Sequence, residues 1–185
     1  MLDGSMRAAA GWKARADYTR FLSLQYAARR PVEAWLAANA PSELCPPAQC
    51  DLIAADLIEL GEQVPESGPH FALYSGACDD APNDCEVLGA AWVLAGSSLG
   101  NRAILKEVRR TAKQSGEQAW PDSFLGDDAM MNFWKTLRRR IERPADINEV
   151  AGASRAAAAV FDHFIALAAN AGDTSELAQR NMTRA

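Results

Sequence analysis

The residues with the clearest chemical potential lie in the segment GSSLGN, positions 96–101. Gly96 and Gly100 are four residues apart, so in a helix they lie on the same face, one turn apart. Each glycine inside a helix costs roughly 0.5–1 kcal/mol relative to alanine, so bare backbone here indicates that something approaches closely. Ser97 and Asn101 flank the glycines at the same spacing. Two interpretations follow: a neighbouring helix packed into a small-residue notch, or a flat ligand against the backbone with polar contacts at its edge.

These residues belong to a longer stretch, Val87–Val108, that predicts a single helix. Its apolar positions recur near a period of 3.6 residues. Asn83 followed by Glu86 is typical of a capping box at its start. Near its end lie four cations that suit the negative end of a helix dipole, namely Lys106, Arg109, Arg110 and Lys113.

Four further helices are predicted around this one, and no stretch shows the alternation of a strand. Their apolar stripes lie within 18–26, 52–60, 130–141 and 150–167. Pro31 is expected to kink or restart the first helix, and Gly61 to end the second. Asp127 or Asp128 is expected to open the third, and Asp146 with Glu149 the last. The chain is therefore predicted to be all-α, a single compact multi-helix bundle over residues 1–185, with 172–185 as a frayed tail.

Composition excludes several classes of protein. A net charge of −5 argues against a nucleic-acid binder, and no apolar run near 18 residues predicts a membrane span. We find no signal peptide, so we expect a cytoplasmic protein with reduced thiols. The pairs Cys45/Cys50 and Cys78/Cys85 are spaced too loosely for zinc, with local disulfides as the alternative. There is no nucleotide-binding glycine loop, catalytic triad or HExxH motif.

The segment GSSLGNRAIL, preceded by AAWVLA, resembles the distal-helix motif of the biliverdin-producing heme oxygenases. It is most similar to the bacterial, phytochrome-associated branch, which usually has EGS-x-LGG-R/A there. The resemblance continues, in the family's order, through DYTRFLSLQYAARRPVEAWL, WPDSFLGDDAMMNFWKTLRRRI and AAAAVFDHFIALA, and covers most of 18–169. Ala95 stands where the family often has Glu, and Asn101 where it has a second Gly.

This resemblance implies a heme-oxygenase-like bundle that cleaves heme to biliverdin, carbon monoxide and iron. Heme is both cofactor and substrate, which fits a chain with little side-chain acid–base apparatus. The implied partners are an electron-donor protein of the ferredoxin or reductase type and a phytochrome as candidate recipient of biliverdin. Ser97 is the expected catalytic residue, because family members hold a water beside the first glycine. The expected heme contacts are Gly96, Gly100, Asn101, Arg102, Phe161 and Phe164.

Several of these assignments have alternatives that need no ligand. Arg102 or Arg109 could meet a propionate, or either could lie on a solvated helix face. Phe161 and Phe164 could close the pocket, or simply fill the core. The run Arg138–Arg140 could receive the donor protein, or be ordinary solvated surface.

The iron ligand is the most serious departure from the family. Its proximal histidine precedes Leu-Asp by three residues, in H-x-x-L-D, whereas only Met1 precedes Leu2-Asp3 here. Either the start lies further upstream, or the ligand has been lost. The second alternative predicts a non-catalytic heme- or biliverdin-binding protein on the same fold. His70 is expected on a loop, and His163 in the last helix is a poorly placed substitute.

Overall fold

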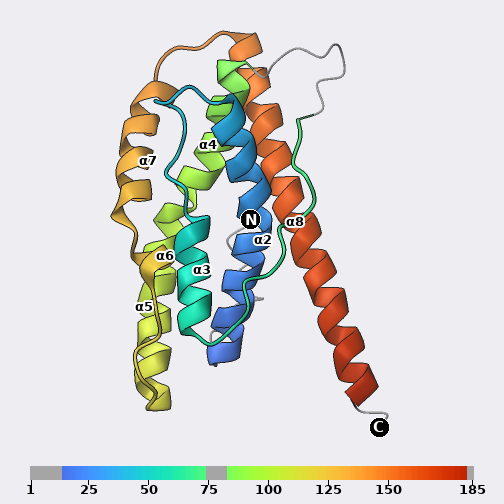
Figure 1. Ribbon diagram of the computed structural model, residues 1–185. Helices are drawn as coiled ribbons and strands as arrows, with labels where there is room; N and C mark the ends of the chain where they lie inside the picture. Colours follow the sequence, from blue (N-terminus) through green and yellow to red (C-terminus); the bar gives the residue numbers. More distant parts are fainter. Residues whose placement is uncertain (1–13, 74–82, 183–185) are drawn as a thin grey trace.

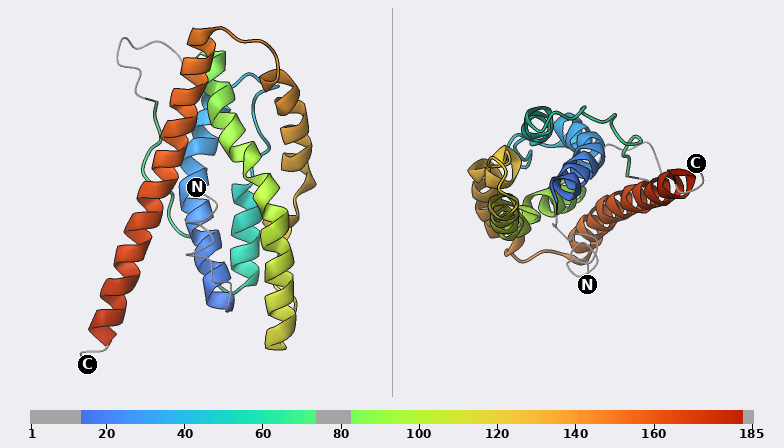
Figure 2. Two further views of the ribbon diagram at one scale, coloured as in Figure 1. Left: turned by 180° about the vertical axis from the view of Figure 1, so that it is seen from behind. Right: turned by 90° about the horizontal axis from the view of Figure 1, so that it is seen from below.

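A computed structural model describes residues 14–73 and 83–182, and every regular element in those ranges is a helix (Figure 1). The helices are α2 (Arg15–Asn39), α3 (Cys50–Glu59), α4 (Asp84–Gly96), α5 (Ser98–Ser115), α6 (Ser123–Gly126), α7 (Asp128–Ile141) and α8 (Ile147–Met182). The all-α prediction is confirmed. Helices α2, α4 and α8 pack together, while α5, α6 and α7 follow one another along one side (Figures 1 and 2). Helix α8 continues past position 172, where the sequence predicts a frayed tail.

Helix α2 continues through Pro31, where the sequence predicts a kink or a restart. Proline has no N–H, so the carbonyl of Ala27, four residues earlier, loses its partner within the helix. The backbone N–H of Gly68 donates to that carbonyl at 3.0 Å. A Cβ on Gly68 would lie 2.6 Å from the same oxygen, so this approach requires glycine. The helix does not restart, because a donor from the loop after α3 replaces the missing bond.

The stretch predicted as one long helix is two helices, because α4 ends at Gly96 and α5 begins at Ser98. The hydroxyl of Ser97 donates to the carbonyl of Leu94 at 2.7 Å, and that of Ser98 to the carbonyl of Ala95 at 2.6 Å. Such side-chain bonds to earlier carbonyls compete with the regular helix ladder and often bend helices. Two adjacent serines after a glycine therefore account for the break.

Three predicted helix starts are confirmed by their capping hydrogen bonds. At α4, the side-chain oxygen of Asn83 accepts from the backbone N–H groups of Cys85 and Glu86, both at 3.0 Å. The carboxylate of Glu86 completes the capping box by accepting from the Asn83 N–H at 3.2 Å. Asp127 caps α7 and Asp146 caps α8 through the same kind of contact. These caps fix where α4, α7 and α8 enter the bundle.

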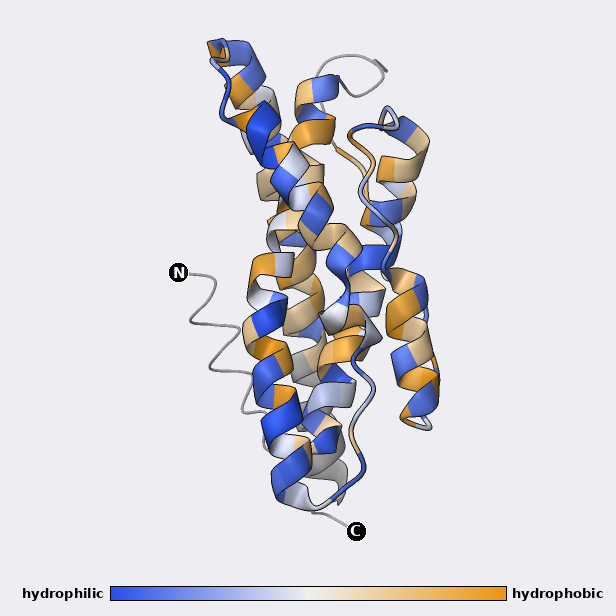
Figure 3. Ribbon diagram, turned by 90° about the vertical axis from the view of Figure 1, so that its left-hand side faces the viewer, coloured by the Kyte–Doolittle hydropathy of each residue, from blue (hydrophilic) through white to orange (hydrophobic). Residues whose placement is uncertain are grey.

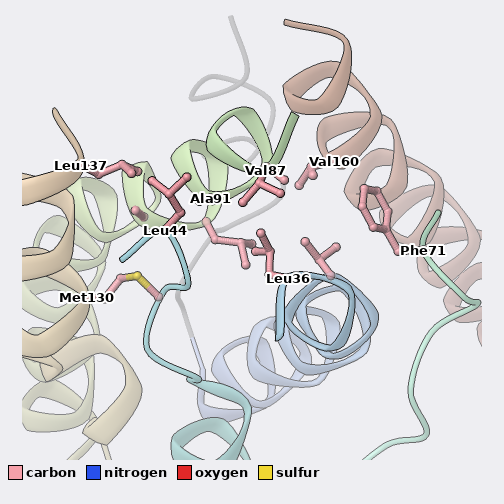
Figure 4. Packing of buried hydrophobic residues seen from close by; sticks show 12 residues of the cluster. Leu36, Leu44, Phe71, Val87, Ala91, Met130, Leu137 and Val160 are labelled. Atoms are coloured by element: carbon pink, nitrogen blue, oxygen red, sulfur yellow. The ribbon is translucent and has the colours of Figure 1, made fainter. Parts of the chain in front are cut away.

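Buried apolar side chains form two clusters along the bundle. The first joins α4 to α2, α7 and α8 and includes Leu36, Val87, Ala91, Met130 and Val160 (Figure 4). The second joins the first half of α2 to α3, α5 and α6, and its buried members include Tyr18, Leu22, Ile53, Leu57, Leu105, Val108 and Phe124. The junction between α4 and α5 therefore lies where one cluster gives way to the other.

Helices α4 and α8 touch backbone to backbone at one point. A Cβ on Gly89 would lie 2.1 Å from the carbonyl oxygen of Ala153, which no side chain could tolerate. Beyond this point α8 diverges from α5 toward its C-terminal end (Figure 2). The buried stripe predicted for α8 is partly wrong: Val160 is buried, but Val150 is 53% exposed. The stripe predicted for α7 also ends early, because Ile141 is 37% exposed.

The segment Ile147–Ala171 of α8 is long and apolar enough to cross a membrane, by length and composition alone. An 18-residue window within it has a mean hydropathy of 1.2, and only 17% of that window is buried in the structure. This finding differs from the expectation that no stretch of the sequence is a candidate span. It is the one candidate among the described residues, and a single helix of this kind is weak support for a membrane-spanning protein.

Candidate functional site

Gly96 and Gly100, the two glycines of the predicted notch, have different surroundings. A Cβ built on Gly100 would have no neighbouring atom within 4 Å, so the position opens onto free space. A Cβ on Gly96 would meet only the ring of Trp134, at 3.6 Å. The tight helix contact is instead at Gly89, about two helix turns before Gly96. Within the described residues, the helix-packing interpretation therefore lacks a packing partner at Gly100.

Aromatic side chains from three helices gather beside Gly96. The ring centroid of Trp92 on α4 lies 6.4 Å from that of Trp134 on α7 and 6.5 Å from that of Phe161 on α8. Trp92 is 38% exposed, and Leu99, at the start of α5, is 54% exposed. We call these three aromatic residues and Gly96, together with the exposed positions Leu99 and Gly100 that follow at the start of α5, the open aromatic face. It is an apolar surface with bare backbone at its edge, which suits a flat, largely apolar ligand.

A buried guanidinium lies behind this face. Arg29 on α2 is only 1% exposed, and one of its terminal nitrogens donates to the Ser97 hydroxyl oxygen at 2.5 Å. Its Nε donates to the Gln25 side chain at 3.1 Å, and its guanidinium carbon lies 5.1 Å from the centre of the Phe124 ring. The other terminal nitrogen, Nη1, has no hydrogen-bond partner among the described residues. Ser97 thus connects an exposed surface to a buried charge.

Two buried carboxylates, Glu33 and Asp56, each cap the N-terminus of a helix. The Glu33 oxygens accept from the backbone N–H groups of Gln49 and Cys50, at 3.0 and 3.3 Å, at the start of α3. The Asp56 oxygens accept from the N–H groups of Ser123 and Phe124 at 3.0 Å, at the start of α6. Burial raises the pKa of Asp56, although these hydrogen bonds oppose the shift. Both carboxylates are structural caps, and neither pairs directly with the buried guanidinium.

Of the polar residues predicted at the site, only Ser97 lies there. Asn101 is buried, with 7% of its surface exposed, so it faces the interior rather than a ligand edge. Arg102 is paired with Asp128 at the start of α7. Arg109 pairs with Asp122 at 2.7 Å. Figure 3 shows that hydrophilic residues are frequent on the side of the molecule that α5 and α7 form. The Arg109–Asp122 ion pair raises the pKa of Arg109, and the two predicted propionate contacts already have carboxylate partners.

Phe161 and Phe164, both predicted to line the pocket, lie in different places. Phe161 contacts Trp92 on the open aromatic face, whereas Phe164 packs against the first core cluster. His163, the fallback iron ligand, lies between Phe71 and Phe164, with ring centroids 5.6 and 6.3 Å away. Burial lowers its pKa, a hydrogen bond to the Ala28 carbonyl opposes the shift, and its Nε2 is buried without a partner. His163 thus links α8 to α2 rather than serving the face.

No metal site is evident in the part of the chain that the structure describes. No group of three His, Cys, Asp or Glu side chains could hold an ion there. His70 is exposed and lines a shallow hollow of about 470 Å³ between α2 and the loop after α3. A second hollow of about 340 Å³ lies between α5 and the segment 117–122. Neither hollow includes a residue of the open aromatic face, and the exposure of Trp92 and Leu99 indicates that this face is open to solvent.

The cysteines take no part in the site. Cys45, Cys50 and Cys85 are all free thiols, so the alternative of a Cys45–Cys50 disulfide is not realised. Burial is the main cause that raises the pKa of Cys50, which keeps this thiol protonated and inert. Cys78 lies outside the described residues.

Comparisons with known proteins bear on the fold. No model of a known protein family and no curated protein matches this sequence. Among solved structures, the heme oxygenase from Neisseria meningitidis, determined with NO and CO bound, matches with a TM-score of 0.61. The match covers 92% of this chain and 84% of the other, at 18% sequence identity. The chain has a heme-oxygenase-like fold.

On this heme-oxygenase-like fold, two features of the site could not be predicted from the sequence. Arg29 is half of an Arg-Arg pair that would ordinarily be solvated, and its burial follows only from the packing of α2 against α4–α6. The spacing of Gln25 and Arg29, one helix turn apart, was the available signal. Trp92 lies inside a helix predicted to be core, so its exposure was not visible from periodicity.

Proposed function

We propose that this chain is a heme oxygenase that cleaves heme to biliverdin, carbon monoxide and iron, using oxygen and electrons from a donor protein. The observation that carries the proposal is the open backbone at Gly100 beside an exposed aromatic face, on a heme-oxygenase-like fold. A flat ring needs close approach over an extended area, and bare glycine backbone provides it.

The described residues fit one face of such a ring. Gly96 and Gly100 leave room for it, and Trp92, Trp134 and Phe161 offer apolar contact. Heme, when bound, supplies the oxygen-activating iron and is itself the substrate. Ser97, held by Arg29 and by the Leu94 carbonyl, has a fixed hydroxyl with which to hold water at the ring's edge. Fixed polar groups of this kind orient a reacting partner without reorganising during the reaction.

One observation favours a second candidate, a heme- or biliverdin-binding protein without turnover. Both histidines lie away from the face: His163 is packed between α2 and α8, and His70 lies at the distant hollow. The described residues therefore offer no imidazole to an iron at the open aromatic face. The two candidates differ in the iron ligand and share the ring-binding surface.

Hemin titration followed by the Soret band tests ring binding. We expect a saturable 1:1 complex whose spectrum differs from that of free hemin. A spectrum unchanged from free hemin would overturn both candidates. Mixing the complex with a reductant and oxygen then separates them, because biliverdin absorbance and released carbon monoxide appear only with turnover.

The partners belong to the same proposal. An electron donor of the ferredoxin or reductase type would dock on the basic side of α7, and a phytochrome of the associated bacterial branch would receive the biliverdin in the cytoplasm. Of the run proposed for docking, Arg138 pairs with Glu142 at 2.6 Å and Arg140 with Glu43 at 3.8 Å. These exposed pairs are weak and exchangeable, so they do not prevent a partner's carboxylates from competing for the arginines.

A further inference from the structure

The least expected charge in the molecule is Arg29. It is 1% exposed, and no carboxylate within the described ranges makes an ion pair with it. The carboxylates of Glu33 and Asp56 are each engaged by two backbone N–H groups. Burial lowers the pKa of Arg29, and the charge of the nearby Glu33 carboxylate opposes that shift. Because the pKa of arginine starts very high, the guanidinium stays protonated at ordinary pH. The interior therefore holds a positive charge that Glu33 offsets from a distance, without forming an ion pair.

This arrangement is costly for stability alone. A buried charge without a paired partner costs several kcal/mol, and an unused N–H adds a further penalty. Its contacts with Gln25, Ser97 and the Phe124 ring repay only part of this. An apolar side chain of similar length would fill the same space between α2 and the α4–α5 junction. We therefore expect Arg29 to have a function other than stabilising the fold.

The position of the charge indicates that role. Arg29 reaches the open aromatic face through Ser97, which is exposed and adjoins Gly96. Within a protein, a unit charge acts over several ångströms much more strongly than in water. A ligand atom beside Ser97 therefore experiences a positive potential, while the large aromatic surface around it is neutral.

We propose that Arg29 is a specificity-determining residue that makes this site select small anionic ligands over neutral ones beside Gly96 and Ser97. The inference rests on the proposed heme-binding function and adds the class of the second, small ligand. Arg29 acts as a positioning residue: it holds the Ser97 hydroxyl and supplies charge, without itself entering the exposed surface.

Azide and imidazole, one anionic and one neutral at pH 8, are suitable probes of the hemin-loaded protein. In Arg29→Gln we expect azide to bind about tenfold more weakly, because one unit charge has been removed at short range. Imidazole affinity should stay within about twofold. The matched control Arg29→Lys keeps the charge while losing the planar hydrogen-bonding fork, so azide affinity should stay within about threefold of the original.

A purely structural arginine would weaken both probes in parallel in both variants, and that outcome would overturn the inference. The apoprotein gives a second readout that needs no heme. Arg29→Met should leave the melting temperature equal or higher, because a buried unpaired charge is replaced by an apolar side chain. A marked fall would show that the arginine is kept for folding and would also overturn the inference. Failure of the original chain to bind hemin at all would instead remove the proposed function, and this inference with it.

Discussion

A substitution at Gly100 distinguishes the two interpretations of the glycine notch, a bound flat ligand and a packed helix. Leucine forms helices better than glycine, and the space around this position is open, so Gly100→Leu should preserve α5. The branched side chain would nevertheless cover the bare backbone of the open aromatic face. We expect normal circular dichroism and hemin affinity weakened at least about tenfold, or about 1.4 kcal/mol.

Ala37→Leu is a matched control, because it adds the same side chain at an exposed position of α2, a helix that contributes nothing to the face. Hemin affinity should not change in this variant. Equal affinity in both variants would place the ligand elsewhere, and unfolding of Gly100→Leu alone would restore the helix-packing interpretation.

Residue types and spacing singled out part of the candidate site. The notch at Gly96 and Gly100, the serine between them and Phe161 could be found because glycine and aromatic positions are visible in a helical pattern. Asn101 was misplaced because helical spacing does not show which face of α5 is turned toward the interior, and Asn101 is buried there. Arg29 could not be found, since burial of a charged side chain depends on three-dimensional packing.

At the scale of helices, two glycines of the same predicted helix should respond oppositely to alanine. At Gly89 the new Cβ would meet the Ala153 backbone at 2.1 Å, so α4 and α8 must separate. Overpacking of this kind costs about 1–3 kcal/mol, more than the better helix propensity of alanine returns. At Gly100 nothing opposes the new methyl group, so the gain should be roughly 0.5–1 kcal/mol.

Urea unfolding of Gly89→Ala and Gly100→Ala measures both effects on one scale. A destabilised Gly100→Ala would mean that another part of the chain occupies the space above α5. A stabilised Gly89→Ala would contradict the close contact between α4 and α8.

The helix starts were the most predictable elements, because a cap is a local interaction between residues two or three positions apart. Asn83, Asp127 and Asp146 all act as the sequence indicates. Pro31 was less predictable, because the donor that keeps α2 continuous is Gly68, distant in sequence. Local rules fix where helices begin, and long-range contacts decide whether they continue.

At the scale of the whole molecule, composition and periodicity predicted the all-α class, and the order of motifs predicted the heme-oxygenase-like fold. The exposure of α8 could not be predicted from the same periodicity. An apolar stripe shows that a helix face avoids water in some state, but it does not say what covers it. Val150 and Ile165 are 53% and 51% exposed in the structure, although they lie on a helix with an apolar pattern.

No described residue provides an iron ligand at the open aromatic face. Hemin held by burial and aromatic contact alone would have no histidine ligand among the described residues. Added imidazole should therefore bind the hemin complex of this chain and shift its Soret band, because neutral imidazole is a good iron ligand.

Placing the heme oxygenases' H-x-x before Leu2-Asp3 should supply an imidazole ligand from the protein itself and shift the Soret band in the same way. We expect the extended protein to show a histidine-ligated spectrum without imidazole and, with an electron donor, to produce biliverdin. Replacing the added histidine by alanine is the control, and it should return both the spectrum and the imidazole response to those of the unextended chain. If the unextended chain already shows a histidine-ligated spectrum, His163→Ala identifies the source. Loss of the spectrum in that variant would mean that α8 moves enough to bring His163 to the iron, and that ligation in this protein differs from the family's geometry.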